Sequence, residues 1–267
     1  MQNRTLIFIL TCLLAACVKV PDPSAPAIAP AIVAEPVGNR IEGLRVATRV
    51  GCNGCHTKTG AGKVFVEQVG KFRLVAANLT EKRALYDDGA LEGLIRHGKT
   101  HDGHFPLGMP IKMFQYLSDQ EILDITAWLR ALPAVGNADL PDGMLSDEIK
   151  SQLKAGTFPH DDFLPDPIVQ SSEKVPTEAL ALGKHLAMTS CPECHGPDLN
   201  GFPGDDTPSL VVAKAYTHEN FSRLMKTGIL SNGKESKSGL MTGVGRKRFS
   251  VMSDVEVRAL KAYLDSR

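Results

Sequence analysis

Two stretches of sequence decide the fold of this chain: CNGCH at residues 52–56 and CPECH at residues 191–195. Each stretch holds two cysteines three positions apart, with a histidine directly after the second cysteine. Two thiols at this spacing reach the two vinyl groups of one porphyrin, and the histidine then lies beneath the iron as its proximal ligand. The motifs predict two covalently bound haem c groups, attached through Cys52, Cys55, Cys191 and Cys194, with His56 and His195 as iron ligands.

A redox-active dithiol and a zinc site are the alternatives for these cysteines. A dithiol does not require the histidine that follows both pairs. A structural zinc ion needs four ligands, which the two pairs would supply only jointly, and the adjacent histidines would then have no role. Haem attachment accounts for all three residues of each motif and is the interpretation we prefer.

Length and charge set broad limits on the class of protein. The 267 residues suffice for one large domain or two small ones. Lys and Arg total 30, and Asp and Glu also total 30, so no excess charge favours binding to nucleic acid. Aromatic residues make up only 6%, which is few for two independent cores unless a large apolar group such as haem fills them.

The N-terminal residues 1–16 have the layout of a secretory signal peptide. Arg4 precedes an apolar run at residues 6–14 that is too short to span a bilayer as a helix. The sequence LAAC at residues 14–17 resembles the bacterial lipobox, which implies cleavage before Cys17 and acylation of that cysteine. An ordinary signal peptide with an incidental Cys17 is the alternative.

The segment after Cys17 predicts a tether. Residues 17–39 are rich in Pro and Ala and show neither helical nor strand periodicity, which is typical of an extended spacer. Several acyl chains on one residue anchor a protein stably. The expected location is therefore the periplasmic side of a bacterial membrane, and Val18 favours the outer membrane by resemblance to lipoprotein sorting rules.

An internal repeat predicts two copies of one small helical module, at residues 40–133 and 177–267, joined by a Pro-containing linker at 134–176. In each copy a Ser-x-x-Glu capping box, at 118–121 and 253–256, precedes apolar residues at helical spacing. Leu117 and Met252 stand where hydrophobic staples are expected. Gly98 and Gly228 are predicted to end a shorter helix in each copy.

The helix before the first haem motif has a weaker signature. Asn39 and Glu42 have capping-box spacing, and Ile41, Leu44 and Ala47 follow at three-residue spacing that predicts one buried face. Residues 177–187 hold the same place before the second motif. The expected order in both modules is helix, haem motif, loop, short helix, ligand loop and C-terminal helix.

That order resembles the class I cytochrome c domain, twice over. The first module is also similar to the cytochrome c subunits of quinoprotein alcohol dehydrogenases, on the stretches ANLT at 77–80, IRHG at 95–98 and Met109-Pro110. The resemblance implies an all-α fold of two tandem class I cytochrome c-like domains after the signal peptide and tether. It further implies electron transfer and points to Met109 as the sixth iron ligand of the first haem.

The repeat gives an independent argument about the sixth ligands. Phe114 aligns with Phe249, so Met113 aligns with Arg248, which cannot bind iron, and Met252 aligns with the packing residue Leu117. Met241 remains as the predicted sixth ligand of the second haem. Core packing is the alternative for any methionine, and a loop histidine (His97, His101 or His104) is the alternative to Met109.

Two His/Met-ligated irons predict an electron carrier rather than an enzyme. Because both axial positions are filled, substrate cannot bind iron without displacing methionine, and the soft thioether raises the reduction potential. The expected donor is a periplasmic dehydrogenase or quinol-oxidising complex, and the expected acceptor is an oxidase or another cytochrome. The chain would be a free carrier or the electron-transfer subunit of a dehydrogenase.

Two other functions remain open at this point. A dihaem enzyme, peroxidase-like or thiosulfate-oxidising, would need one labile sixth ligand, and a haem-based sensor would need an output domain. Basic residues near both motifs also predict a docking patch for an acidic partner, or simply a solvated surface: Lys58, Lys63, Lys71, Arg73, Lys234, Lys237, Arg246, Lys247 and Arg248.

Overall fold

The computed structural model describes residues 37–267 except 159–168, 170, 203 and 205–206. The predicted signal peptide (1–16), the predicted acylation site Cys17 and most of the predicted tether (17–39) lie outside the described residues. Residues 40–133 are called the N-terminal half and residues 177–267 the C-terminal half. Both belong to one compact unit, Pro36–Arg267.

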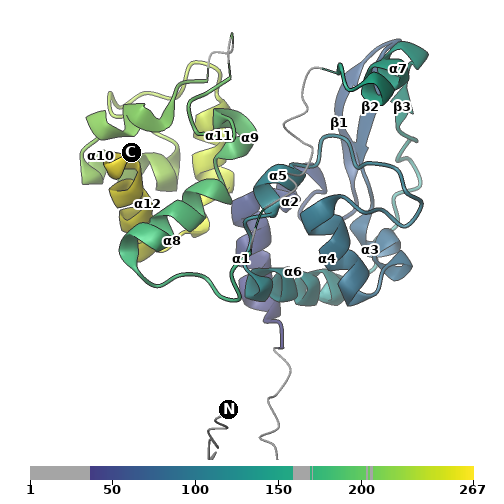
Figure 1. The fold of residues 1–267 in the computed structure, drawn as a ribbon, viewed down its shortest axis with the longest axis horizontal. Coiled ribbons are helices and arrows are strands. Elements are labelled where there is room, and N and C mark those ends of the chain that lie inside the picture. Colours follow the sequence, from purple (N-terminus) through teal and green to yellow (C-terminus); the bar gives the residue numbers. More distant parts are fainter. Residues whose placement is uncertain (1–36, 159–168, 170, 203, 205–206) are drawn as a thin grey trace, which may run out of the picture. The chain divides into compact units, whose positions relative to one another are not determined.

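The N-terminal half is mainly helical (Figure 1). Its first helix, α1, begins after Asn39, whose side chain accepts hydrogen bonds from two backbone N–H groups of the first turn. Gly51 ends α1 in the left-handed conformation, with φ 97°. The helices of this half are α1 (Arg40–Val50), α2 (Cys52–Cys55), α3 (Leu79–Lys82), η1 (Arg83–Leu85), α4 (Asp88–His97), α5 (Ile111–Phe114) and α6 (Asp119–Ala131).

The C-terminal half repeats this order of helices (Figure 1). A helix precedes the second haem motif, a one-turn helix holds the motif, and a long helix ends the chain. The helices of this half are α8 (Ala179–Met188), α9 (Pro192–His195), η3 (Leu210–Ala215), α10 (His218–Thr227), α11 (Leu240–Lys247), η4 (Phe249–Val251) and α12 (Asp254–Ser266).

The predicted capping boxes begin both long C-terminal helices. Ser118 and Ser253 accept the N–H of the third helical residue, and the glutamates at that position accept the N–H of the serine in return. Leu117 and Met252 are almost fully buried, as staples require. Gly98 and Gly228 end α4 and α10 in the left-handed conformation. These local predictions are confirmed.

The predicted capping box at Asn39 is wrong in its second half. The Asn39 N–H donates to Asp124 Oδ1 at 2.7 Å, whereas Glu42 forms an ion pair with Arg45. The predicted buried face of α1 is wrong for Ile41 and Leu44, which are 73% and 45% exposed, whereas Ala47 is buried as predicted. The buried face runs instead through Gly43, Val46, Ala47 and Val50.

Glycines explain which face of the helix is buried. A Cβ atom on Gly43 would lie 1.8 Å from the backbone oxygen of Asp124, so α1 and α6 cross with their backbones in contact. The C-terminal half has the same crossing, where a Cβ on Gly183 would lie 2.1 Å from the oxygen of Ala259. Asp124 and Ala259 each stand six residues after the serine of the capping box. The repeat therefore extends to the contact between the first and last helices of each half.

A small antiparallel sheet corrects the all-α prediction. β1 (Lys63–Gln68) and β2 (Phe72–Ala76) form a hairpin in the N-terminal half, and β3 (Met144–Leu145) pairs with β2. Gly70, with φ 78°, lies in the hairpin turn. The fold is therefore helix-rich, with a three-stranded sheet inserted after the first haem motif.

The segment 134–176, predicted as a linker, supplies β3 and the helix α7 (Asp147–Ala155). Ser172 and Glu173 accept backbone hydrogen bonds from the first turn of α6. Val175 packs against the core of the C-terminal half. The described residues of this segment thus contact both halves.

Buried apolar side chains gather in two clusters. One lies in the N-terminal half and includes Val46, Leu91, Ile125 and Trp128. The other lies in the C-terminal half and draws on the matching helices: Leu186, Phe221, Leu224, Phe249, Val257 and Leu260. Each cluster packs against the cysteine-containing turn of its own half through Cys52 or Cys191.

Candidate haem sites

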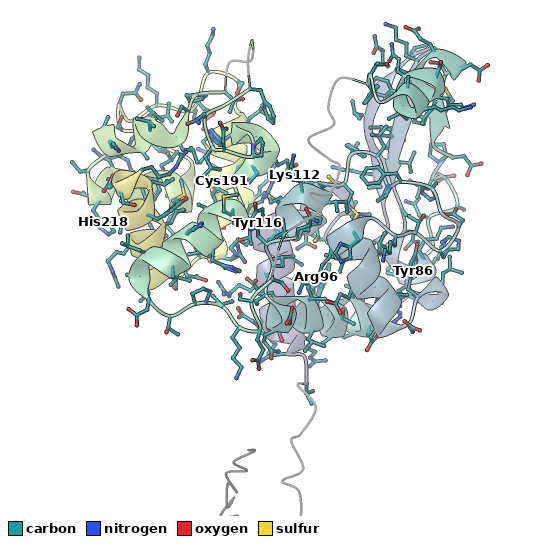
Figure 2. All side chains as sticks on the ribbon, viewed as in Figure 1. Tyr86, Arg96, Lys112, Tyr116, Cys191 and His218 are labelled. Carbon is teal, nitrogen blue, oxygen red and sulfur yellow. The ribbon has the colours of Figure 1, made fainter. Side chains whose placement is uncertain are left out.

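Each predicted haem motif folds as one turn of helix directly after a longer helix. His56 N–H donates to Cys52 O at 2.9 Å, and His195 N–H donates to Cys191 O at the same distance. Residues three apart on a helix lie on one face, so each turn presents its two thiols together. Figure 2 labels Cys191 at the beginning of α9. All four thiols of the two motifs are free of disulfide bonds.

The two histidines are held by equivalent hydrogen bonds. His56 Nδ1 lies 2.9 Å from the oxygen of Ala77, and His195 Nδ1 lies 2.8 Å from that of Pro208. A carbonyl oxygen only accepts, so Nδ1 carries the proton and donates, which leaves the Nε2 lone pair available to a metal. Burial lowers the pKa of both imidazoles and outweighs the opposing carbonyl hydrogen bond. Both rings are thus oriented and kept neutral, as iron ligation requires.

The thiols are held in apolar surroundings. Burial raises the pKa of Cys52 and of Cys191 to about 12, and it raises the pKa of Cys55 and Cys194 as well. A neutral buried thiol beside an apolar cavity is consistent with attachment to a large apolar group.

A large apolar cavity adjoins both turns. Its volume is about 1060 Å³, slightly above the roughly 300–1,000 Å³ range of ligand pockets. Cys191, Cys194, His195 and Met241 all line it, together with Cys55 from the first motif. The C-terminal half therefore fits a haem c group: two thiols, an oriented imidazole and a thioether border one apolar space.

Met109, unlike Met241, does not itself line this cavity. It is partly buried and packs against the core of the N-terminal half. Its neighbours Gly108 and Pro110 line the cavity, and so does Met113, which is 1% exposed. The alternative loop ligands are all exposed: His97, His101 and His104. His101 instead contacts the ring of Tyr86, and His104 pairs with Asp102.

Three of the nine basic residues in the predicted docking patch form ion pairs. Arg248 has only 13% of its side chain exposed and pairs with Glu193 at 2.6 Å. Arg73 pairs with Glu67, and Arg246 with Glu235, each at 2.7 Å. Arg248 does not belong to the exposed surface predicted for it, because its side chain is mostly buried against Glu193 of the second haem motif.

A buried charge cluster joins the two halves, and no local sequence pattern predicted it. Glu121 of α6 accepts from Arg49 Nη2 at 2.6 Å and lies 2.9 Å from His185 Nε2. Arg49 Nη1 donates to the hydroxyls of Thr189 and Ser190, next to the second motif. Burial opposes ionisation of Glu121, but the hydrogen bond from His185, the charge of Arg49 and the Ser118 N–H outweigh it and lower its pKa to about 2.

These features define a covalent haem-binding site of the c type in the C-terminal half. Residues 180–267 match the model of the cytochrome c family, so this chain contains a cytochrome c domain. The domain implies covalently bound haem c, indicates haem-based electron transfer and is typical of exported proteins.

Wider comparisons add little to this result. Among solved structures, the chain is similar to the thiosulfate dehydrogenase TsdBA from Marichromatium purpuratum, in its as-isolated form, at 23% identity and a TM-score of 0.25. The match covers 85% of this chain and 40% of the dehydrogenase chain, and at this TM-score it carries no argument. No curated protein gives a significant match. Within the described residues, no helix is long and apolar enough to cross a membrane.

Proposed function

We propose that this protein is a dihaem c-type cytochrome that transfers single electrons through two His/Met-ligated haems. The observation that carries the proposal is the equivalence of the two motifs. In both, a helical turn presents two thiols, and the following imidazole donates from Nδ1 to a backbone oxygen, at 2.9 Å for His56 and 2.8 Å for His195. The N-terminal half thus has the same proximal arrangement as the half that matches the cytochrome c family.

The residues of this chain have distinct tasks in that function. A haem c group bound at each turn would supply one-electron chemistry between ferric and ferrous iron. The cysteines fix its position and the Nδ1 hydrogen bonds orient His56 and His195. Met109 and Met241 would each offer iron a soft thioether sulfur, which favours the ferrous state. The apolar wall of the cavity excludes water and lowers the local dielectric constant.

Cellular placement is the second part of the proposal. The lipobox-like sequence supports export and acylation at Cys17, with the folded part on the periplasmic side of a bacterial membrane. Electrons would come from a periplasmic dehydrogenase or quinol-oxidising complex and pass to an oxidase or another cytochrome. We expect the mass of the mature N-terminal peptide to show a diacylglyceryl group on Cys17. A C17S variant is expected in the soluble periplasmic fraction, and an unacylated membrane-free wild type would refute the anchor.

The first test counts the haems. The exported protein should contain two haems per chain, measured as the pyridine haemochrome and by intact mass. A C52S/C55S variant and a C191S/C194S variant should each retain one. A wild-type protein with a single haem would refute the dihaem assignment and leave the cytochrome c domain at residues 180–267 as the sole haem site.

The second test separates a carrier from an enzyme. Visible spectra are recorded for the oxidised and dithionite-reduced protein, before and after adding carbon monoxide. A far-red sulfur-to-iron band in the oxidised form, with no response of the reduced form to carbon monoxide, supports methionine at both irons. Ready binding by about half of the haem would show one labile sixth ligand and favour the dihaem enzyme.

A further inference from the structure

One side chain, Arg248, contacts the second haem motif and the backbone directly before the first. It follows α11 in the C-terminal half, and its Nε donates to the backbone oxygen of Arg49 at 3.1 Å. Its guanidinium carbon lies 2.8 Å from the position that a Cβ atom would take on Gly51, the residue that begins the first haem turn. Its Nη1 donates to Glu193 Oε2 at 2.6 Å, inside the second turn. Arg248 therefore bridges the two attachment turns.

The Arg248–Glu193 pair is sheltered from solvent. The Arg248 side chain is 13% exposed and that of Glu193 is 30% exposed. Arg248 Nη2 is buried without a hydrogen-bond partner, and both residues line the apolar cavity. Burying a guanidinium with an unsatisfied N–H donor costs folding free energy, because the donor loses its hydrogen bonds to water. Charges at a low dielectric constant act over longer distances than charges at the surface.

The pair borders the same cavity as cysteines of both turns. Arg248 and Glu193 line this cavity together with Cys55 of the first turn and with Cys191 and Cys194 of the second turn. The two attachment edges thus lie within the field of one ion pair.

We propose that Arg248 and Glu193 jointly set the reduction potentials of both haems. The inference rests on the proposed dihaem function. Reduction removes one positive charge from each haem, so the nearby guanidinium favours the reduced state of both and the carboxylate opposes it. Because the two charges act on both sites, neither potential is set within its own half alone. Both residues are positioning residues that act through electrostatics, since neither is expected to touch iron.

The test is a spectroelectrochemical titration of the haem-loaded, full-length protein and its R248Q and E193Q variants. We expect R248Q to lower both midpoint potentials and E193Q to raise both. The expected size for R248Q is about a tenfold change in the equilibrium between oxidised and reduced haem, which is about 59 mV for one electron. The double variant R248Q/E193Q should return towards the wild-type potentials.

The ion pair of Arg246, two residues before Arg248, is the control. Arg246 pairs with Glu235 at 2.7 Å, but these side chains are 48% and 58% exposed, and Arg246 bonds to Thr227 O rather than to a haem turn. R246Q should leave both potentials where they are. Equal shifts in R246Q and R248Q would overturn the proposal, because the effect would then be one of net charge.

Other results of these measurements would also support or overturn the proposal. A purely mechanical bridge would lower the unfolding midpoint in both variants without opposite shifts in potential, and this result overturns the proposal. A shift in one haem alone also overturns it. If R248Q does not load haem, the near-isosteric E193Q decides: a rise in both potentials supports the proposal and unchanged potentials refute it. Fewer than two haems in the wild type would refute the dihaem function instead, a result the haem count distinguishes.

Discussion

Replacing Glu121 by glutamine tests the buried cluster that joins the two halves. Glutamine keeps the shape of the side chain and its place in the capping box, but it removes the charge that faces Arg49 and His185. The Arg49 and Glu121 side chains are 1% and 5% exposed. Breaking a buried ion pair by removing one partner costs about 3–5 kcal/mol, because the other charge is left uncompensated.

The lowered pKa of Glu121 gives a second way to calculate the free energy that this buried ion pair contributes. Its fall from the ordinary value of 4.5 to about 2 is worth about 3 kcal/mol at neutral pH, at about 1.4 kcal/mol per pKa unit. Because the pKa in the folded state is the lower one, this stabilisation is complete well above pH 4.5 and is lost as the pH falls towards 2. At pH 3.5 the wild type should already have lost more than about 1 kcal/mol of it.

Urea unfolding of the haem-loaded protein, followed by far-ultraviolet circular dichroism at pH 7 and pH 3.5, measures both effects. We expect E121Q to be less stable than the wild type by about 3–5 kcal/mol at pH 7, with a smaller difference at pH 3.5. E256Q is the control, since Glu256 has the same place in the second capping box and its partner Arg45 is 31% exposed. Partly exposed pairs contribute about 0–1 kcal/mol. The reasoning fails if E121Q and E256Q are equally stable at pH 7, or if the E121Q difference does not change with pH.

Three further predictions concern ligation, helix contact and buried arginine. M109A or M241A should let about half of the reduced haem bind carbon monoxide, seen as a shifted Soret band, whereas the buried-core controls M113A and M225A should not. G43A and G183A should each lower the free energy of unfolding by about 1–3 kcal/mol through overpacking; the control is G243A, where a Cβ would meet no atom within 4 Å. R96M should cost about 2 kcal/mol in the same urea assay, because Arg96, labelled in Figure 2, is buried and donates to Leu117 O and Asp119 at 2.6 Å each. The exposed pair of Arg73 supplies its control, since R73M should cost less than about 1 kcal/mol.

Local signals in the sequence predicted the parts of the fold that depend on neighbouring residues. The capping boxes at Ser118 and Ser253 and the glycine stops at Gly98 and Gly228 involve groups within one or two turns of each other. The hydrogen bonds of each haem turn likewise join residues that are close together in the sequence. Such features are visible in a single sequence because the hydrogen-bond partners are fixed by spacing alone.

The sheet was missed because it interrupts the repeat. The sequence KVFVEQ at 63–68, with β-branched residues on either side of Phe65 and a following glycine, is typical of a strand leading into a turn. It lies in the N-terminal half only, so comparison of the two copies gave it no counterpart. β3 is two residues long and depends on pairing with β2 across about seventy residues; no local pattern indicates such a strand.

The prediction that Ile41 and Leu44 lie on the buried face of α1 failed for a different reason. Three-residue spacing of Ile41 and Leu44 suggested an apolar face, but the helix packs through Gly43, which counts as neutral in any hydrophobic pattern. Where two backbones touch, the contact surface is marked by the smallest residue rather than by the most apolar one. The position of α6 decides this face, and it is fixed only by the tertiary structure.

Departures from the internal repeat locate the contact between the two halves. Arg49 stands three residues before the first haem cysteine, where the second copy has Met188. Arg248 stands directly before Phe249, where the first copy has the buried Met113. Each half therefore replaces a methionine of its counterpart by an arginine, and both arginines reach the other half.

The pattern follows from the packing of similar modules. Phe114 and Phe249, which are buried in the cores of their own modules, are apolar in both copies. A position at the contact between modules faces different surroundings in each copy, so the two residues there are free to differ. Charged residues at such a contact remain buried only with partners from the other module, as Arg49 has in Thr189 and Arg248 in the oxygen of Arg49. In a chain with two copies of one module, an apolar residue in one copy matched by arginine in the other is thus a sequence signal for the contact between them.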